Sequence, residues 1–398
     1  MCRQRSLTRA LTVVPVVGAV RMPTLVLRQA MKATFIGAIS VGLLCMMRKL
    51  HVSRRQASCR LLFHARDPCT FVHWMMQGAA KPAGMSFKDF MYDCFKKDVA
   101  AGIAANAEIP RHLAFDPATH RSKLRTMTFN VHFFQKGFSG VCLGDATDEV
   151  LGVIERVNPD LLMLQEVPPS LLSSLREKLA SIHGLAHFVA AGSADVHVLD
   201  PSVGIFPNER LHVVVASKLP FRRSGAVPML DGNAAFAEVE LDGATSALVY
   251  SLHLSVRCEA SKRRDEVASV VDHAHAQRMP HALTLIAGDM NQPNEVDYPG
   301  AEWEAIAADM RRAKLDLSDG ARDFLRGAEF ETTFEAAAAP KPLPSTTAWN
   351  GALVDYIYIN HKARAAEVDA TWAYHTLASD HLPLVTDVTP RLAPQPRA

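Results

Sequence analysis

The sequence predicts an α/β fold in which two mixed sheets pack face to face with helices outside them. From Leu124 onward, short apolar strand candidates alternate with helical stretches. Hairpin turns such as Asp231-Gly232 and Asp242-Gly243 separate several of the strands. A single parallel sheet joined by helical crossovers would not show such hairpins, so two sheets are the predicted arrangement.

Strands and helices alternate in the first part of this region. In chain order we expect a strand over 124–134, a helix over 146–159, a strand over 160–167 and a helix over 169–184. Pro159 stops the first helix because proline cannot continue the backbone ladder. Ser170 is the expected N-cap of the second helix, and Gly184 ends it.

Strands dominate the second part of the region. The expected strands cover 212–218, 234–243, 246–254, 282–291, 352–360 and 381–388. Helices are expected over 261–278 and 302–314, and a loop rich in alanine and proline over 335–351.

The chain is 398 residues long, which predicts one large domain with an extension. We place the catalytic domain at 123–390, a helical extension or linker at 67–122, a basic leader at 1–66 and a short tail at 391–398. The net charge of +2 does not by itself indicate a polyanionic partner.

The leader contains no Asp or Glu between Met1 and Arg66, whereas Arg and Lys recur along it. This composition is typical of a transit peptide for an organelle, a mitochondrion or a plastid. A membrane anchor is the alternative, because residues 33–47 form an uncharged run. That run is shorter than the roughly 20 residues that span a bilayer as a helix. A third reading is that translation starts at Met22, Met31 or later.

The seven cysteines are scattered and contain no C-x-x-C pair. They therefore predict neither a zinc site nor a disulfide framework, and the catalytic domain is expected to be reduced.

Polar residues stand at the ends of the predicted apolar strands, where they could meet in one site. They are Asn130, Glu166, His253, Asp289, Asn291, Asp355, Asp380 and His381. Each one alone is explained as well by a capped turn; the Gly-Asp-x-Asn of 288–291, for example, also fits an Asx turn. Burying so many carboxylates is costly unless they are paired or bind a cation, so together they predict a functional site.

The chemistry of these residues favours a hard cation. Carboxylate and amide oxygens suit Mg²⁺, with Mn²⁺ as a substitute, and the set contains no cysteine and only two histidines, which disfavours zinc. A cation that neutralises a phosphate, beside histidines that exchange protons, indicates phosphoester hydrolysis.

In order and type, the segments "TMTFN", "LLMLQEV", "YSLHL", "IAGDMN", "LVDYIYIN" and "ASDHLPLV" resemble the endonuclease/exonuclease/phosphatase superfamily of deoxyribonuclease I-like hydrolases. The resemblance covers about 124–388. It implies a four-layer α/β/β/α sandwich whose site lies where strand ends of both sheets converge.

The resemblance also implies roles for the individual residues. Glu166 would be the main metal ligand, with Asn130 beside it and Asp380 near the metal. Asp289 and Asn291 would align the attacking water and hold the phosphate, and His253 would bond a phosphate oxygen or protonate the leaving oxygen. Asp355 would orient His381. The general base stays open between Asp289 and His381.

Within the superfamily, "LLMLQEVPPSLL" and the histidine and helix of "SLHLSVRCEASKRRDE" resemble 5′-tyrosyl-DNA phosphodiesterases. Phe129 stands where that branch has tryptophan, and "DGNAAFAEVEL" lacks the arginine that the branch places before this strand. These departures affect the substrate rather than the reaction class.

Two functions follow as expectations. The first is a Mg²⁺-dependent phosphodiesterase or nuclease that acts on nucleic acid or a 5′-protein–DNA adduct, as in DNA repair. The second is a sphingomyelinase-like lipid phosphodiesterase, or a hydrolase of another small phosphoester, which membrane contact through residues 33–47 would favour. We take a monomer as the default oligomeric state.

Overall fold

The structure is a computed structural model. It describes residues 123–138, 141–193, 210–256, 258–277, 283–298, 300–312, 315–318, 320–337, 347–348, 352–360 and 366–391, together with positions 99, 100, 102, 103, 106, 112, 114–116 and 118. The leader 1–66, with its apolar run, lies outside these residues. None of the helices described is long and apolar enough to cross a membrane.

The first large sheet has six strands in the order β13-β14-β1-β4-β6-β5. Their bounds are β1 (Leu124–Asn130), β4 (Leu161–Val167), β5 (His187–Gly192), β6 (His212–Ser217), β13 (Ala366–Ala373) and β14 (Leu384–Pro390). β1 and β4 run parallel, and the other neighbours are antiparallel.

The second large sheet also has six strands, in the order β11-β12-β10-β9-β8-β7. Their bounds are β7 (Phe221–Pro228), β8 (Asn233–Glu240), β9 (Ser246–His253), β10 (Leu283–Asp289), β11 (Phe330–Thr332) and β12 (Asp355–Asn360). Here β9 and β10 form the parallel pair. A separate hairpin pairs β2 (Gln135–Phe138) with β3 (Val141–Asp145).

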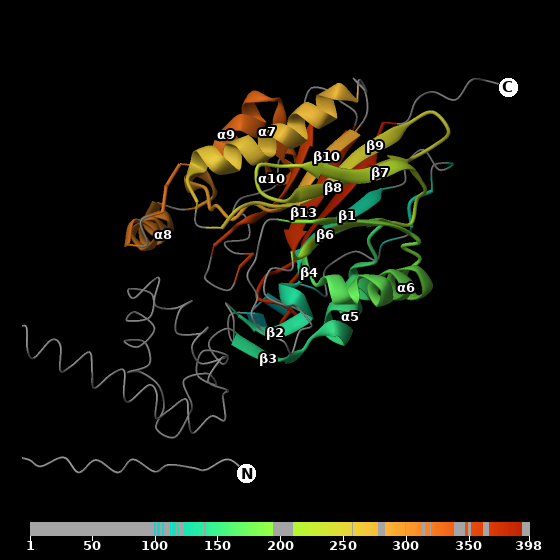
Figure 1. Cartoon of the computed structure of the whole chain (residues 1–398), viewed down its shortest axis with the longest axis horizontal. Coiled ribbons are helices and arrows are strands. Elements are labelled where there is room, and N and C mark those ends of the chain that lie inside the picture. The colour runs from blue at the N-terminus through green and yellow to red at the C-terminus, as the bar shows by residue number, and fades with distance from the viewer. Residues whose placement is uncertain are drawn as a thin grey trace, which may run out of the picture. The chain divides into compact units, whose positions relative to one another are not determined.

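Helices lie on both outer faces of the paired sheets. Their bounds are α5 (Thr147–Val157), α6 (Leu172–His183), α7 (Ala260–Ala276), α8 (Gly300–Arg312), α9 (Gly320–Gly327) and α10 (Thr333–Ala336). Short 3₁₀ turns are η2 (His132–Phe134), η3 (Pro169–Leu171) and η5 (Glu295–Asp297). Figure 1 shows α7 and α9 over the second sheet and α5 and α6 under the first. The predicted four-layer α/β/β/α sandwich is therefore confirmed.

The central strands of the first sheet are buried on both faces, as β4 illustrates. Leu161 and Met163 belong to the core between the two sheets, whereas Leu162 and Leu164 belong to the core under α5 and α6. A strand covered on both faces reads as a continuous apolar run, which explains the sequence of β4. Such burial holds the ends of the central strands in defined places.

Several predicted boundaries were wrong, by two or more residues, as for the strand expected over 352–360, which begins at Asp355, and the loop expected over 335–351, whose first two residues belong to α10. Two further cases have a clear local cause. The first strand ends at Asn130 rather than at 134, because η2 turns the chain with positive φ at each of its three residues. Ser170 does not cap α6, since it lies in η3 and the helix begins two residues later. Gly184 does end α6, in the left-handed conformation with φ 68° that glycine adopts easily.

Candidate active site

Strand register places three of the predicted residues side by side at the ends of three neighbouring strands of the second sheet. Asp289, the last residue of β10, is the register partner of His253 at the end of β9. Asp289 is also paired with Asp355, the first residue of the antiparallel strand β12. All three side chains are almost completely buried. The end of an apolar strand therefore explains the position of each polar residue.

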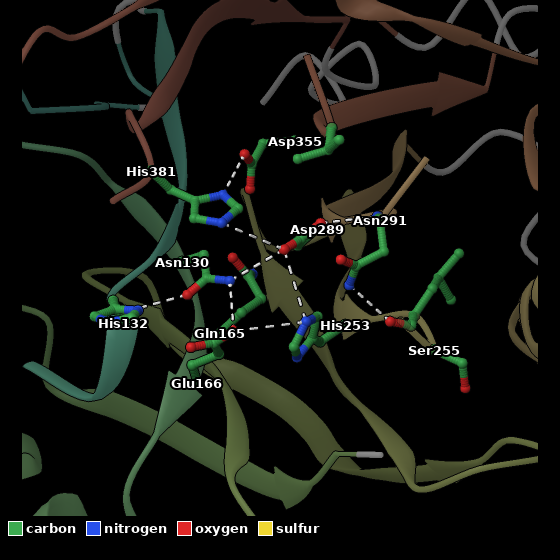
Figure 2. Close-up of polar contacts among 12 residues, drawn as sticks. Asn130, His132, Gln165, Glu166, His253, Ser255, Asp289, Asn291, Asp355 and His381 are labelled. Carbon is green, nitrogen blue, oxygen red and sulfur yellow. Dashed lines mark hydrogen bonds and ion pairs between the residues drawn. The ribbon is translucent and has the colours of Figure 1, made fainter. Parts of the chain in front are cut away.

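The first sheet contributes Asn130 and Glu166. Asn130 ends β1 and is the register partner of Gln165 on the parallel strand β4. Glu166 follows within a β-bulge, where the pairing of β4 with β6 shifts between Leu164 and Val167, and its φ is 59°. A bulge inserts an extra residue and re-aims a side chain. Figure 2 shows Glu166 close to Asn130.

Asn130 joins the two sheets across the site. Its Nδ2 donates to Oε1 of Glu166 at 3.1 Å and to Oδ2 of Asp289 at 3.0 Å. The backbone N–H of His132 donates to Oδ1 of Asn130 at 3.1 Å, which fixes the orientation of the amide. His253 adds its Nε2, 3.6 Å from Oδ2 of Asp289 and 3.8 Å from Oε1 of Glu166.

His381 and Asp355 form a buried pair beside Asp289. Nδ1 of His381 lies 2.8 Å from Oδ2 of Asp355, and Nε2 of His381 lies 3.8 Å from Oδ2 of Asp289 (Figure 2). Burial alone would lower the pKa of His381, but the charge and hydrogen bond of Asp355 outweigh it and raise this pKa well above its usual value. Burial raises the pKa of Asp355 to about 6. The hydroxyl of Thr347 accepts a bond from the Asp355 backbone N–H at 3.1 Å.

Asp380 faces a histidine that the sequence analysis missed. Its Oδ1 lies 3.1 Å from Nδ1 of His132 and 4.0 Å from Nε2 of His381. Burial opposes protonation of His132, but the charge of Asp380 outweighs burial and raises the pKa of His132 above its usual value. Position alone could have drawn attention to His132, which lies two residues after a predicted metal ligand.

Asn291 is part of an Asx turn and also lies next to Asp289. Its backbone N–H donates to Oδ1 of Asp289 at 2.8 Å, and its Nδ2 donates to the carbonyl of Leu254 at 2.8 Å. The next residue, Gln292, accepts a bond from Nη2 of the buried Arg263 at 2.5 Å. This arginine and glutamine were not predicted as site residues, and they hold the loop that follows β10.

The residues present fit a hard divalent cation. Among the residues described, ligand atoms of Asp289, Asp355 and His381 all lie within 4.8 Å of one another. Asn130 contacts this cluster at Asp289 and joins Glu166 to it. Oδ1 of Asp355 is buried with no hydrogen-bond partner in the described part of the chain. Clustered buried carboxylates of this kind are stabilised by a cation. Of the predicted ligands, Asn130 and Glu166 touch each other, whereas Asp380 is paired with His132.

Comparison with known proteins shows the family of the chain. The model of the endonuclease/exonuclease/phosphatase family matches residues 127–381, and the chain belongs to that family. Its members are generally phosphoester hydrolases that depend on a divalent metal. No curated protein sequence matches the chain.

Solved structures are similar to the chain at low sequence identity, and the first of the three that follow shares its fold. An endonuclease/exonuclease/phosphatase protein from Beutenbergia cavernae is 21% identical with a TM-score of 0.52, over 70% of this chain and 73% of that one. Truncated TDP2 from Caenorhabditis elegans is 16% identical with a TM-score of 0.44, over 67% and 97%. The human Nocturnin catalytic domain is 16% identical with a TM-score of 0.45, over 69% and 96%.

Proposed function

We propose that this protein is a Mg²⁺-dependent phosphodiester hydrolase that acts on nucleic acid or a 5′-protein–DNA adduct. The observation that carries the reaction class is the bridge through Asn130, which brings Glu166 of one sheet and Asp289 of the other onto a single amide nitrogen. Carboxylates brought together at the edge of two sheets, with two histidines within 4 Å of one of them, make a site for a cation and a phosphate.

Glu166 is the proposed main ligand of the cation, with Asn130 and Asp289 beside it. The side chain of Glu166 is 15% exposed, so it can be reached from solvent, whereas that of Asp289 is 2% exposed. Asn130 and His253 both approach Oε1 of Glu166. A bound Mg²⁺ would neutralise charge on the phosphate. Mn²⁺ is the proposed substitute.

Asp289 is the proposed general base. The charge and hydrogen bond of Asp355 raise the pKa of His381 well above its usual value, which favours Nε2 as a donor toward developing negative charge over a role as proton acceptor. Asp289 lies next to that Nε2 and is oriented by Asn130 and by the backbone N–H of Asn291. His253 is the proposed donor to a phosphate oxygen or to the leaving oxygen.

The substrate class is supported by the motifs around Glu166 and His253, which resemble those of 5′-tyrosyl-DNA phosphodiesterases. A role in DNA repair, delivery to an organelle by the leader, and a monomeric state belong to the same proposal. The competing function is that of a lipid phosphodiesterase, which the uncharged run 33–47 favours.

The test is hydrolysis by the full chain of a panel that holds single-stranded DNA, abasic duplex, 5′-tyrosyl oligonucleotide, RNA and sphingomyelin. Each substrate is assayed with Mg²⁺, with EDTA, with Asp289→Asn and with the control Asp272→Asn, which changes an exposed aspartate of α7. We expect turnover of a nucleic-acid member that EDTA and Asp289→Asn abolish and the control retains. Turnover of sphingomyelin alone would assign the lipid function, and equal turnover in EDTA would overturn the metal mechanism.

A further inference from the structure

The loop 374–383, between β13 and β14, carries both Asp380 and His381. The backbone closes the loop at its base, where the N–H of Tyr374 donates to the carbonyl of Pro383 at 2.8 Å. Inside the loop, Ser379 donates through Oγ to the carbonyl of Asn130 at 2.7 Å and accepts from the backbone N–H of His381 at 3.1 Å. The positions of two site residues therefore depend on the conformation of this one loop.

Residues ahead of the family match pack against this loop and its flanks. Val99 is 4% exposed and forms a small apolar cluster with Ala373 and Leu382, with Leu377 packed against it. The ring of His375 occupies the space where a side chain on residue 102 would begin, and that residue is glycine. Val99 and Gly102 thus contact the loop and its flanks closely. They belong to a segment that lies outside the residues matched by the family, 127–381.

Asn106 adds a directional contact to the same loop. Its Nδ2 donates to the carbonyl of His375 at 2.7 Å, and its Oδ1 accepts from the backbone N–H of His375 at 3.0 Å. The two bonds join residues 269 positions apart. A side-chain amide that satisfies both polar groups of one residue fixes the backbone there in place and in orientation.

We infer that Val99, Gly102 and Asn106 form an N-terminal clamp that positions the loop 374–383 and, through it, Asp380 and His381. These three are positioning residues, because none of them touches the reacting groups. Site residues usually lie on loops that a rigid scaffold must hold, and here part of that scaffold lies ahead of the family domain. The inference gives the extension a role in the site.

Loss of the clamp should lower turnover more than binding. A misplacement of about 1 Å far from the chemistry can cost on the order of 100-fold in rate. The proposed cation site of Glu166, Asn130 and Asp289 lies at strand ends that the clamp does not touch. The same holds for His253, the proposed partner of a phosphate oxygen, so KM should change little. The kinetic measurement of kcat and KM rests on the proposed function, whereas the protection of the loop against hydrogen exchange does not.

The experiment compares four full-length proteins: wild type, Asn106→Ala, Asn106→Asp and Ile103→Ala. Asn106→Asp keeps the acceptor for the His375 N–H and loses the donor to its carbonyl, and Ile103 is a control because its side chain is 46% exposed on the same segment. Amide exchange of peptides that span 374–383 is measured by mass spectrometry. The values of kcat and KM are measured on the nucleic-acid substrate, well below the melting temperature of each variant.

We expect protection of the loop and kcat to fall together, in the order wild type, Asn106→Asp, Asn106→Ala. The loss of kcat in Asn106→Ala should be about 10-fold, with KM within about two-fold of the wild-type value. Ile103→Ala should behave like wild type. A lower melting temperature with unchanged loop exchange and unchanged kcat would show a structural role only and overturn the inference. If no substrate is turned over, the proposed function fails, and the exchange of the loop still decides: unchanged protection in Asn106→Ala overturns the clamp.

Discussion

The Nδ1 of His381 lies 2.8 Å from Oδ2 of Asp355, 26 residues earlier in the chain, so the other ring nitrogen is directed at Asp289. A carboxylate behind a histidine fixes both its orientation and its protonation. This geometry makes Asp355 a positioning residue for His381, and it separates the role of His381 from that of the proposed metal ligands.

Asp355→Asn is expected to lower kcat by about 100-fold while the Mg²⁺ concentration for half-maximal rate stays within about two-fold. The amide keeps the shape of the side chain but removes the charge that holds the proton on His381. Steady-state kinetics at several Mg²⁺ concentrations measure both values, with Asp272→Asn as the control. A shift in Mg²⁺ requirement alone would place Asp355 among the metal ligands instead.

The same pair predicts how the stability of the metal-free protein depends on pH. The pKa of His381 in the folded protein is raised above 6.5, the value of an unperturbed histidine. Above pH 6.5 the folded state therefore binds more protons than the unfolded state, and folding takes up a proton. The stabilisation from this proton is complete below pH 6.5 and is lost as the pH rises through the folded pKa, by as much as about 1.4 kcal/mol per pH unit. Urea unfolding in EDTA between pH 6 and pH 9 measures the decline, which His381→Gln should flatten. An equal slope in wild type and variant would contradict this assignment.

Gly288→Ala is expected to destabilise the fold by about 2 kcal/mol or more. Gly288, directly before Asp289, has a φ of 149°. A Cβ at this position would overlap the backbone carbonyl of Leu252 on β9. Gly243→Ala is the matched control, because a Cβ at that turn meets no atom within 4 Å and should change stability by at most about 0.5 kcal/mol. Urea unfolding of both variants tests this, and equal losses would refute the close approach at Gly288.

His132→Phe is expected to raise the Mg²⁺ concentration for half-maximal rate by about 10-fold, since residues that support a metal site indirectly cost 10-fold to 100-fold when changed. The phenyl ring fills the space but loses the contact between Nδ1 and Asp380. His132→Asn, which keeps a donor near that position, should recover part of the loss. Identical Mg²⁺ dependence in wild type and His132→Phe would show that the pairing with Asp380 has no bearing on the metal.

Several elements could be predicted because their signal is local. β10 is a buried apolar run that ends in Gly288 and Asp289, and register then brings Asp289 beside His253 and Asp355. The strands that were missed include β5, β7 and β13, each at the edge of its sheet. They are only partly buried and lack the regular alternation that marks a half-buried strand.

Other features of the site depend on contacts between distant residues and have no local signature. The bulge that presents Glu166 arises from the pairing of β4 with β6, and Glu166 itself has the uncommon φ of 59°. The pairing of His132 with Asp380 depends on two loops, and η2 has three consecutive residues with positive φ, which local propensities disfavour. The order and type of the polar residues indicated which side chains lie together, which no single motif did.

The central claim is that Glu166 holds the cation on which hydrolysis depends, and the most direct test is a Mg²⁺ titration of the rate for wild type and Glu166→Gln. The glutamine keeps the size of the side chain and removes its charge, so we expect the variant to need at least about 10-fold more Mg²⁺ for half-maximal rate, or to lose turnover. Wild-type turnover must also vanish in EDTA. If Glu166→Gln shows the same half-saturating Mg²⁺ concentration and the same maximal rate as wild type, the assignment of the metal site is contradicted.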